Sequence, residues 1–188
     1  HLILQLALLP LLPLLPMCML AYSWYIYYNI DCYNGLSCRS VNSKYIAGTQ
    51  QEDAMSFKVC SLFSGSSGNS TYIGTDRTHI LVDAGVSMKN IVAGLSQINV
   101  DSRDLKGILV THEHSDHITS VGAISRKFNV PIYANESTWQ AMESKLGRID
   151  AVNRRVFYND MDFYIQDINV QPYQIPHDAA DPVGFSFF

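Results

Sequence analysis

The chain has 188 residues, enough for one domain of ordinary size, and 47% of them are hydrophobic while 16% are charged. This composition excludes an intrinsically disordered chain, because such chains hold too little apolar matter to form a core. The formal net charge of −4 argues against a protein that coats nucleic acid through bulk positive charge, although a local basic groove is compatible with it.

Residues 1–54 differ in character from the rest of the chain. Residues 1–30 contain no acidic residue and no Lys or Arg, and their apolar run is long enough to suggest a membrane anchor. Three spaced prolines disfavour a straight helix, and the positive start of a signal peptide is missing. Residues 31–54 are polar and without periodicity, and Met55 reads as the natural start of a cytosolic protein. We therefore favour upstream sequence over an anchor, and expect residues 1–54 to lie outside the fold and to pack poorly against it.

The cysteines indicate a reducing compartment. Three of the four precede Met55, and their spacing predicts neither a disulfide scaffold nor a zinc ribbon. We expect Cys60 to be a small buried residue in a strand. This usage favours a cytoplasmic protein, with membrane attachment through residues 1–30 as the alternative.

From Met55 onward, strand and helix patterns alternate. A β-rich run at residues 57–63 precedes a Gly/Ser-rich loop at 64–70, and two short strands follow at 71–74 and 79–82. A helix is expected over residues 87–97, because apolar residues recur along one face and Ser87 is a typical N-cap.

The remaining residues continue this alternation. Residues 108–110 are wholly apolar, which predicts a central strand covered on both faces. Helices are expected over 117–128 and over 136–146, where Gly147 ends the second. Strands are expected at residues 130–134, 156–158, 163–165, 168–175 and 183–187. This order of elements predicts an α/β layered sandwich.

A cluster of metal-binding side-chain types follows the apolar strand. Loops at the carboxyl ends of strands are where α/β sheets form their sites. In an extended segment, residues two apart point the same way, so His112 and His114 can present two imidazoles to one ion. Asp116 and His117 come next, at the start of a helix, where they can face a second ion. Imidazoles and a carboxylate suit zinc, manganese or iron, and two such ions suit hydrolysis.

Plainer interpretations exist for each of these residues. Asp116 could be only a helix N-cap and His117 only a residue of the first turn. Three histidines and an aspartate within six residues are nevertheless difficult to explain without a metal.

The segment also carries a family resemblance. It resembles the H-x-H-x-D-H motif of the metallo-β-lactamase superfamily, in the run Thr111-His112-Glu113-His114-Ser115-Asp116-His117. Other segments resemble the branch known as WalJ or YycJ, namely residues 63–70, 82–85, 131–135 and 176–184. The resemblance covers essentially residues 55–188 and implies a four-layer αββα sandwich.

The resemblance also implies roles for individual residues. His112, His114 and His177 would bind the first metal, and Asp116 and His117 the second. Asp83 would steady the metal loop through hydrogen bonds, as outer-shell carboxylates commonly do. Without the resemblance, His177 would be a strand-end histidine of no known role.

The chain departs from the family pattern beyond His177. That pattern continues with an aspartate that bridges both metals and with a final histidine, whereas this chain stops at Phe188 inside an expected strand. We expect the N-terminal portion of a longer domain, with most of the second αβ half missing. As it stands, we expect it to bind one metal weakly and to be inactive.

The function implied for the complete protein is hydrolysis of DNA. The WalJ branch acts as a 5′-to-3′ exonuclease on double-stranded DNA. Two metals would ionise a bridging water for in-line attack on a phosphodiester, and Asp116 would help to orient the hydroxide. Small residues in the loop at 64–70 could cradle a phosphate with backbone amides, or the loop could simply connect two strands.

Contacts to DNA and rival functions remain open at this point. The backbone of DNA could be met by Lys89, Arg126, Lys127 or Arg148, although a solvated face is the default interpretation. Hydrolysis of a thioester, lactone or β-lactam is the rival enzyme function, since fold alone does not fix substrate. A metal-binding domain without turnover is the non-enzyme alternative. No stable protein partner is expected.

Overall fold

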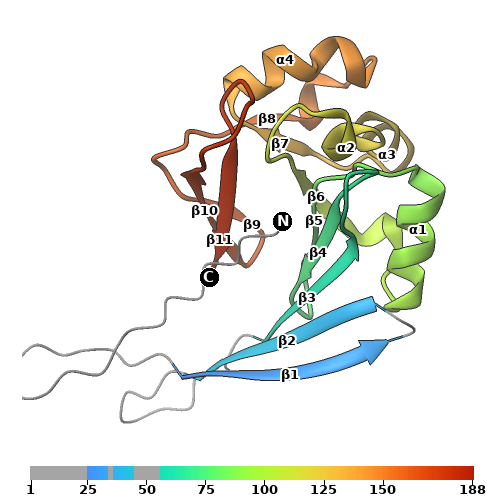
Figure 1. Cartoon of the computed structure of the whole chain (residues 1–188), viewed down its shortest axis with the longest axis vertical. Coiled ribbons are helices and arrows are strands. Elements are labelled where there is room, and N and C mark those ends of the chain that lie inside the picture. The colour runs from blue at the N-terminus through green and yellow to red at the C-terminus, as the bar shows by residue number, and fades with distance from the viewer. Residues whose placement is uncertain (1–24, 34–35, 45–55) are drawn as a thin grey trace, which may run out of the picture.

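The computed structural model describes residues 25–33, 36–44 and 56–188. Within these residues, two sheets lie face to face, and helices cover the outer face of the larger one (Figure 1). The larger sheet has the strand order β1-β2-β3-β4-β5-β6-β7-β8, and the smaller has the order β11-β10-β9.

The larger sheet changes from antiparallel to parallel along its length. Its antiparallel strands are β1 (Tyr25–Tyr33), β2 (Leu36–Lys44), β3 (Ser56–Phe63), β4 (Ser70–Gly74) and β5 (His79–Val82). Strands β6 (Leu105–Leu109), β7 (Ile132–Ala134) and β8 (Arg154–Val156) then continue the sheet in parallel with β5. Parallel neighbours need crossover connections, and helices supply them here.

The crossovers are four α-helices and two short 3₁₀ turns. The helices are α1 (Met88–Gln97), α2 (Ser115–Ile118), α3 (Val121–Phe128) and α4 (Glu136–Leu146). The 3₁₀ turns, η1 (Ser102–Asp104) and η2 (Ala151–Asn153), precede β6 and β8. The smaller sheet is antiparallel and consists of β9 (Phe163–Ile165), β10 (Ile168–Gln174) and β11 (Val183–Phe187).

Two apolar cores lie on opposite faces of the larger sheet. Successive residues of a strand point to opposite faces, so neighbours in the central strands enter different cores. Leu81 and Ile108 belong to the core under the helices, whereas Ile80 and Leu109 belong to the core between the two sheets. All four are fully buried, which confirms the expected central strand covered on both faces.

The layer architecture agrees with the sequence expectation. Helices, the larger sheet and the smaller sheet supply three layers of the expected αββα sandwich, and the described residues contain no second helical layer. Strands and helices expected after Met55 are nearly all present, with ends shifted by a few residues.

Two element predictions were wrong. The helix expected over residues 117–128 is interrupted after Ile118 and resumes at Val121 as α3. Ser120 explains the break, because its amide donates to the Ala84 carbonyl at 2.8 Å and its hydroxyl donates to the Val86 carbonyl. The strand expected at residues 156–158 lies two residues earlier, at Arg154–Val156, where it pairs with β7.

The segment before Met55 gave an unexpected result. Strands β1 and β2 form a hairpin, and β2 pairs with β3 at the edge of the larger sheet (Figure 1). The polar residues 31–54 show no strand periodicity, so these strands were not expected. Residues 1–24, 34–35 and 45–55 lie outside the described residues, so the domain boundary at Met55 stays a prediction, as does the rejection of an anchor in residues 1–30.

Two further expectations concern Cys60 and a membrane anchor. Cys60 is buried in β3, as expected for a small residue in a strand, but it is disulfide-bonded, which the cysteine spacing did not indicate. Among the described residues, no helix combines the length and the apolar character that crossing a membrane would require.

Candidate metal centre

Three predicted ligands converge from the two sheets. His112 and His114 follow β6, and His177 lies in the loop between β10 and β11. The end of β6 and the loop between β10 and β11 lie at the same end of the molecule (Figure 1). One ring nitrogen from each lies within 4.8 Å of those of the other two. The ring centroids of His112 and His114 are 4.7 Å apart, and those of His112 and His177 are 4.6 Å apart. The structure therefore brings together three side chains that the sequence separates by 65 positions.

The orientation of His112 is fixed by hydrogen bonds. The Thr111 hydroxyl donates its single hydrogen to Asp83 Oδ2 at 2.8 Å and lies 2.9 Å from His112 Nδ1. Because that hydrogen is already used, Thr111 Oγ1 acts as acceptor toward His112, whose Nδ1 carries the proton. The lone pair of His112 then resides on Nε2.

The environment of His112 Nε2 fits a cation at this position. It is buried and has no hydrogen-bond partner among the described residues. A buried ring nitrogen without a partner is costly, and a metal ion would use its lone pair. Burial, with further contributions from the other histidines, lowers the pKa of His112 to about 4, so this imidazole is neutral at pH 7 as a ligand must be. The donor set and the geometry both fit a divalent metal ion.

Asp83 connects the neighbouring residues. It is buried at the end of β5, in a left-handed backbone conformation with φ of 61°. One carboxylate oxygen accepts the Thr111 amide at 2.9 Å, and the other lies 2.7 Å from His117 Nδ1. Burial lowers the pKa of His117, but the hydrogen bond to Asp83 and the charges of Asp83 and Asp116 outweigh it, so that pKa lies above its ordinary value.

Asp116 and His117 lie beside the histidine triad. The ring centroid of His117 is 4.0 Å from that of His112, and its Nε2 lies 3.4 Å from Asp116 Oδ2. These two side chains are thus neighbours at the edge of the triad, as the expected second ligand pair requires.

Asn69 is a residue that sequence reasoning missed. Its side-chain amide nitrogen lies 3.2 Å from Asp116 Oδ2 and 3.2 Å from His117 Nε2. Asn69 comes from the Gly/Ser-rich loop, and its backbone amide donates to the Asp116 backbone carbonyl at 2.8 Å. The family-like segment at residues 63–70 was the signal that could have pointed to it.

Three backbone amides of this loop are already hydrogen-bonded within the protein, so they do not serve the phosphate cradle considered above. Asn69 Oδ1 accepts the Gly65 amide, the Gly65 carbonyl accepts the Gly68 amide, and the Asn69 amide is used as described above. These donors are therefore engaged within the protein, and the loop instead places Asn69 beside the candidate ligands.

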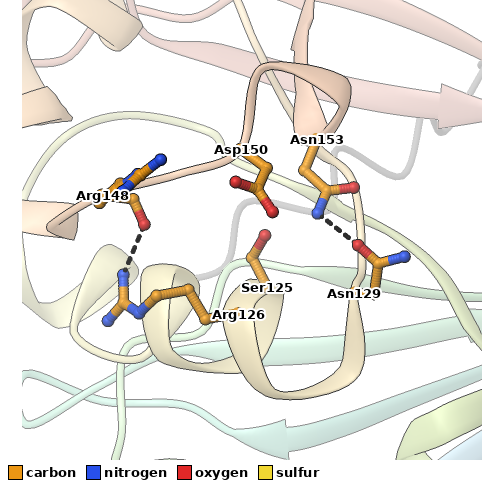
Figure 2. Close-up of a pocket in the computed structure, with 6 residues that line it drawn as sticks. All are labelled: Ser125, Arg126, Asn129, Arg148, Asp150 and Asn153. Atoms are coloured by element: carbon orange, nitrogen blue, oxygen red, sulfur yellow. Dashed lines mark hydrogen bonds between the residues drawn. The ribbon is translucent and has the colours of Figure 1, made fainter.

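A separate pocket lies away from the histidine triad, between the end of α3 and η2. Its cavity volume is about 170 Å³, and Figure 2 shows its lining: Ser125, Arg126, Asn129, Arg148, Asp150 and Asn153. Arg126 Nη1 donates to the carbonyls of Leu146 and Arg148 at 2.6 and 3.3 Å. Of the four basic residues considered for DNA contacts, Arg126 therefore has a structural role, joining α3 to the end of α4.

Comparison with known proteins places this geometry in context. A family model described as the metallo-beta-lactamase superfamily matches residues 64–186. The chain is 45% identical over 133 residues to the exodeoxyribonuclease WalJ of Streptococcus pneumoniae serotype 2, covering 70% of this chain and 49% of that protein. It is also 45% identical over 126 residues to the exodeoxyribonuclease YycJ of Bacillus anthracis, covering 67% and 48%. The chain thus spans about half the length of these curated relatives.

Solved structures show the same fold at lower identity. The metallo-beta-lactamase GOB-18 from Elizabethkingia meningoseptica has a TM-score of 0.58 and 16% identity, covering 69% of this chain and 52% of that one. A B3 metallo-beta-lactamase with an active-site glutamic acid also has a TM-score of 0.58, with 19% identity and coverage of 69% and 53%. At these identities the likeness concerns the fold alone.

Proposed function

This chain belongs to the metallo-beta-lactamase superfamily, and from that premise we propose that the protein is a metal-dependent nuclease, with 5′-to-3′ exonuclease activity on double-stranded DNA. The observation that carries the proposal is the convergence of His112, His114 and His177, with the buried Nε2 of His112 lacking any partner in the described structure. The names of the two 45% identical relatives, both exodeoxyribonucleases, support DNA as the substrate.

The proposed ligands fall into two groups. His112, His114 and His177 hold one divalent ion, and Asp116 and His117 contribute to a second. Zinc suits this mixture of imidazoles and a carboxylate, and manganese and iron accept the same donors. We assign Asp83 the role of holding Thr111 and His117 in place, because its carboxylate bonds to both.

The chemistry divides between the ions and the protein. Divalent ions bound here would lower the pKa of a coordinated water and neutralise charge on a phosphodiester. The chain's own residues fix the donors: Thr111 sets the tautomer of His112, Asp83 holds His117, and Asn69 contacts Asp116. Asp116 also carries the carboxylate that we propose orients the attacking water.

We also propose that exposed basic side chains contact the DNA backbone. Lys89, Lys127 and Arg148 have exposed side chains and remain candidates, whereas the Arg126 guanidinium donates to the carbonyls of Leu146 and Arg148. Phosphate contacts of this kind position a duplex without reading its sequence.

The test is a nuclease assay on the protein in the length that its host produces. Linear double-stranded DNA labelled at one 5′ end is incubated with the protein and zinc or manganese, and labelled mononucleotide is expected to appear first. His112→Ala should abolish the release, and a 5′-phosphorothioate end should slow it. Hydrolysis of a thioester, lactone or β-lactam without any cleavage of DNA would overturn the nuclease proposal in favour of the rival substrate class.

A further inference from the structure

Glu113 lies between two of the candidate ligands and has no role in the site as described so far. In an extended segment it points away from the side shared by His112 and His114. Its Oε1 accepts the backbone amide of Ala180 at 2.9 Å, across 67 positions of sequence. Ala180 belongs to the loop between β10 and β11, which also carries His177. Glu113 therefore joins the loop of the first two imidazoles to the loop of the third.

His177 depends on its loop for its position. His177 is exposed, so packing does little to hold its ring. The far end of the loop is anchored at Val183, whose amide donates to the Thr111 carbonyl at 3.0 Å, and at Asp181, whose carbonyl accepts Asn135 Nδ2 at 2.8 Å. Closer to His177, the hydrogen bond between Glu113 and Ala180 joins this loop to the segment of His112 and His114.

One further contact holds the backbone of Glu113, and its second carboxylate oxygen is buried. Lys145 of α4 donates from Nζ to the Glu113 carbonyl at 3.2 Å, which steadies the backbone. The second carboxylate oxygen, Oε2, is buried and has no hydrogen-bond partner in the described structure. A buried carboxylate oxygen without a partner is unfavourable, so such a residue calls for a specific explanation.

We propose that Glu113 is a positioning residue that holds the loop at residues 177–182 against the metal motif and so brings His177 to His112 and His114. This proposal rests on the proposed function, because it takes the three histidines to be brought together for metal binding. Glu113 acts through the Ala180 amide and does not itself contact the ion.

Two variants separate the hydrogen bond from the charge. Glu113→Ala removes both, whereas Glu113→Gln keeps an oxygen that accepts the Ala180 amide and removes only the charge. Glu143→Ala is the matched control, since Glu143 is an exposed acid on α4 and its loss changes the net charge equally. All are made in the full chain, and circular dichroism and thermal unfolding verify that each variant folds.

The first readout is independent of any metal. Amide hydrogen exchange at Ala180 is measured in metal-free protein, and Glu113→Ala is expected to raise its rate about tenfold, because one hydrogen bond is lost. Glu113→Gln and the control should exchange at the wild-type rate. An unchanged rate in Glu113→Ala would overturn the positioning role whatever the outcome for metal binding.

The second readout is the affinity for Zn²⁺ alone, measured by competition with a chromogenic chelator. Glu113→Ala is expected to weaken binding about 10- to 100-fold, the usual cost of losing a residue that orients a ligand. Glu113→Gln should stay close to wild type. If Glu113→Gln weakened binding as much as Glu113→Ala, the lost charge would be the cause and the proposed positioning role would be wrong. Wild-type protein that bound no zinc, with Ala180 exchange changed as expected, would instead count against the proposed function.

Discussion

Single side chains decide whether the candidate centre is ordered before any ion binds. Asp83 meets the Thr111 amide, the Thr111 hydroxyl and the His117 ring at once, and all three are donors. A carboxylate satisfies such a set because it only accepts hydrogen bonds. The identity of this residue, rather than its size, is thus what the centre requires.

Asp83→Asn is expected to weaken zinc binding about 10- to 100-fold, as losses of residues behind metal ligands typically do. The amide would place an NH₂ group opposite the Thr111 amide in one orientation, or opposite the Thr111 hydroxyl and His117 Nδ1 in the other. Isothermal titration with Zn²⁺ measures the change. An affinity equal to wild type would show that the three hydrogen bonds do not matter for the centre.

Gly85 marks the closest approach of two backbone segments at the centre. A Cβ atom there would lie 1.6 Å from the Asp116 carbonyl oxygen, so Gly85→Ala must push the loop of Asp116 away. We expect it to destabilise the fold by about 1–3 kcal/mol or more, the usual range for overpacking, and to weaken zinc binding as well.

Gly94→Ala is the matched control, because Gly94 lies within α1 and a Cβ there would meet Leu62 Cδ2 of β3 at 3.5 Å, an ordinary van der Waals contact. It should stabilise the protein by roughly 0.5–1 kcal/mol through the helix preference of Ala. Urea unfolding of both variants tests the pair, and destabilisation of equal size at the two positions would contradict the argument.

The candidate residues were predictable from sequence to an unequal degree. His112, His114, Asp116 and His117 lie within six positions, so their type and spacing alone pointed to a metal. His177 and Asp83 were reachable only through the family resemblance. Thr111, Glu113 and Asn69 carry roles that depend on contacts across the fold, and no local pattern distinguishes them from ordinary loop residues.

At the level of elements, local patterns predicted helices well where their own residues determine them. Helix α1 begins at the expected N-cap, where Ser87 accepts the Asn90 amide, and α4 begins and ends at the expected residues. The break between α2 and α3 was not predictable, because Ser120 turns toward carbonyls of a distant loop. The break also shapes the site, because it lets the segment of Asp116 and His117 contact the loop of Gly85.

The turn between β9 and β10 joins the smaller sheet to the larger one. Asp167 in this turn accepts hydrogen bonds from the hydroxyls of Thr78 and Thr75, which lie in the turn between β4 and β5. Burial raises the pKa of Asp167, but these hydrogen bonds outweigh it and hold the pKa below its ordinary value of 3.8. A carboxyl with a lowered pKa stabilises the fold above that ordinary value and loses this effect as the pH falls through the lowered pKa.

Asp167→Asn is therefore expected to destabilise the protein at pH 7 and to match wild type once the pH falls below the lowered pKa. Asp76→Asn is the control, because the ion pair of Asp76 with Lys58 is highly exposed and such pairs contribute little. Thermal unfolding between pH 7 and pH 2 measures both. A gap between Asp167→Asn and wild type that stayed constant over this range would show that ionisation of Asp167 plays no part.

At the scale of the whole molecule, the layers followed from the distribution of apolar residues, but the assembly of the site did not. Alternation along β5 and β6 places Ile80 and Leu109 between the sheets, where Ile168 and Val170 of β10 meet them. This core holds the smaller sheet on the larger one, and His177 lies in a loop of the smaller sheet. Sequence patterns could not show that packing between two sheets would complete a set of ligands begun by a single loop.

Zinc should consequently stabilise the whole fold, and His177 should be needed for the full effect. An ion that binds only the folded state at 100 times its dissociation constant adds about 2.7 kcal/mol to stability, which for a chain of this size corresponds to a rise in melting temperature of roughly 5–10 °C. EDTA should reverse the rise. His177→Ala should lose most of it, because the ion then bonds to the larger sheet alone, whereas Gln171→Ala, at an exposed position of β10, should keep it. Scanning calorimetry with and without zinc measures the increments, and an equal increment in His177→Ala and wild type would show that the smaller sheet contributes no ligand.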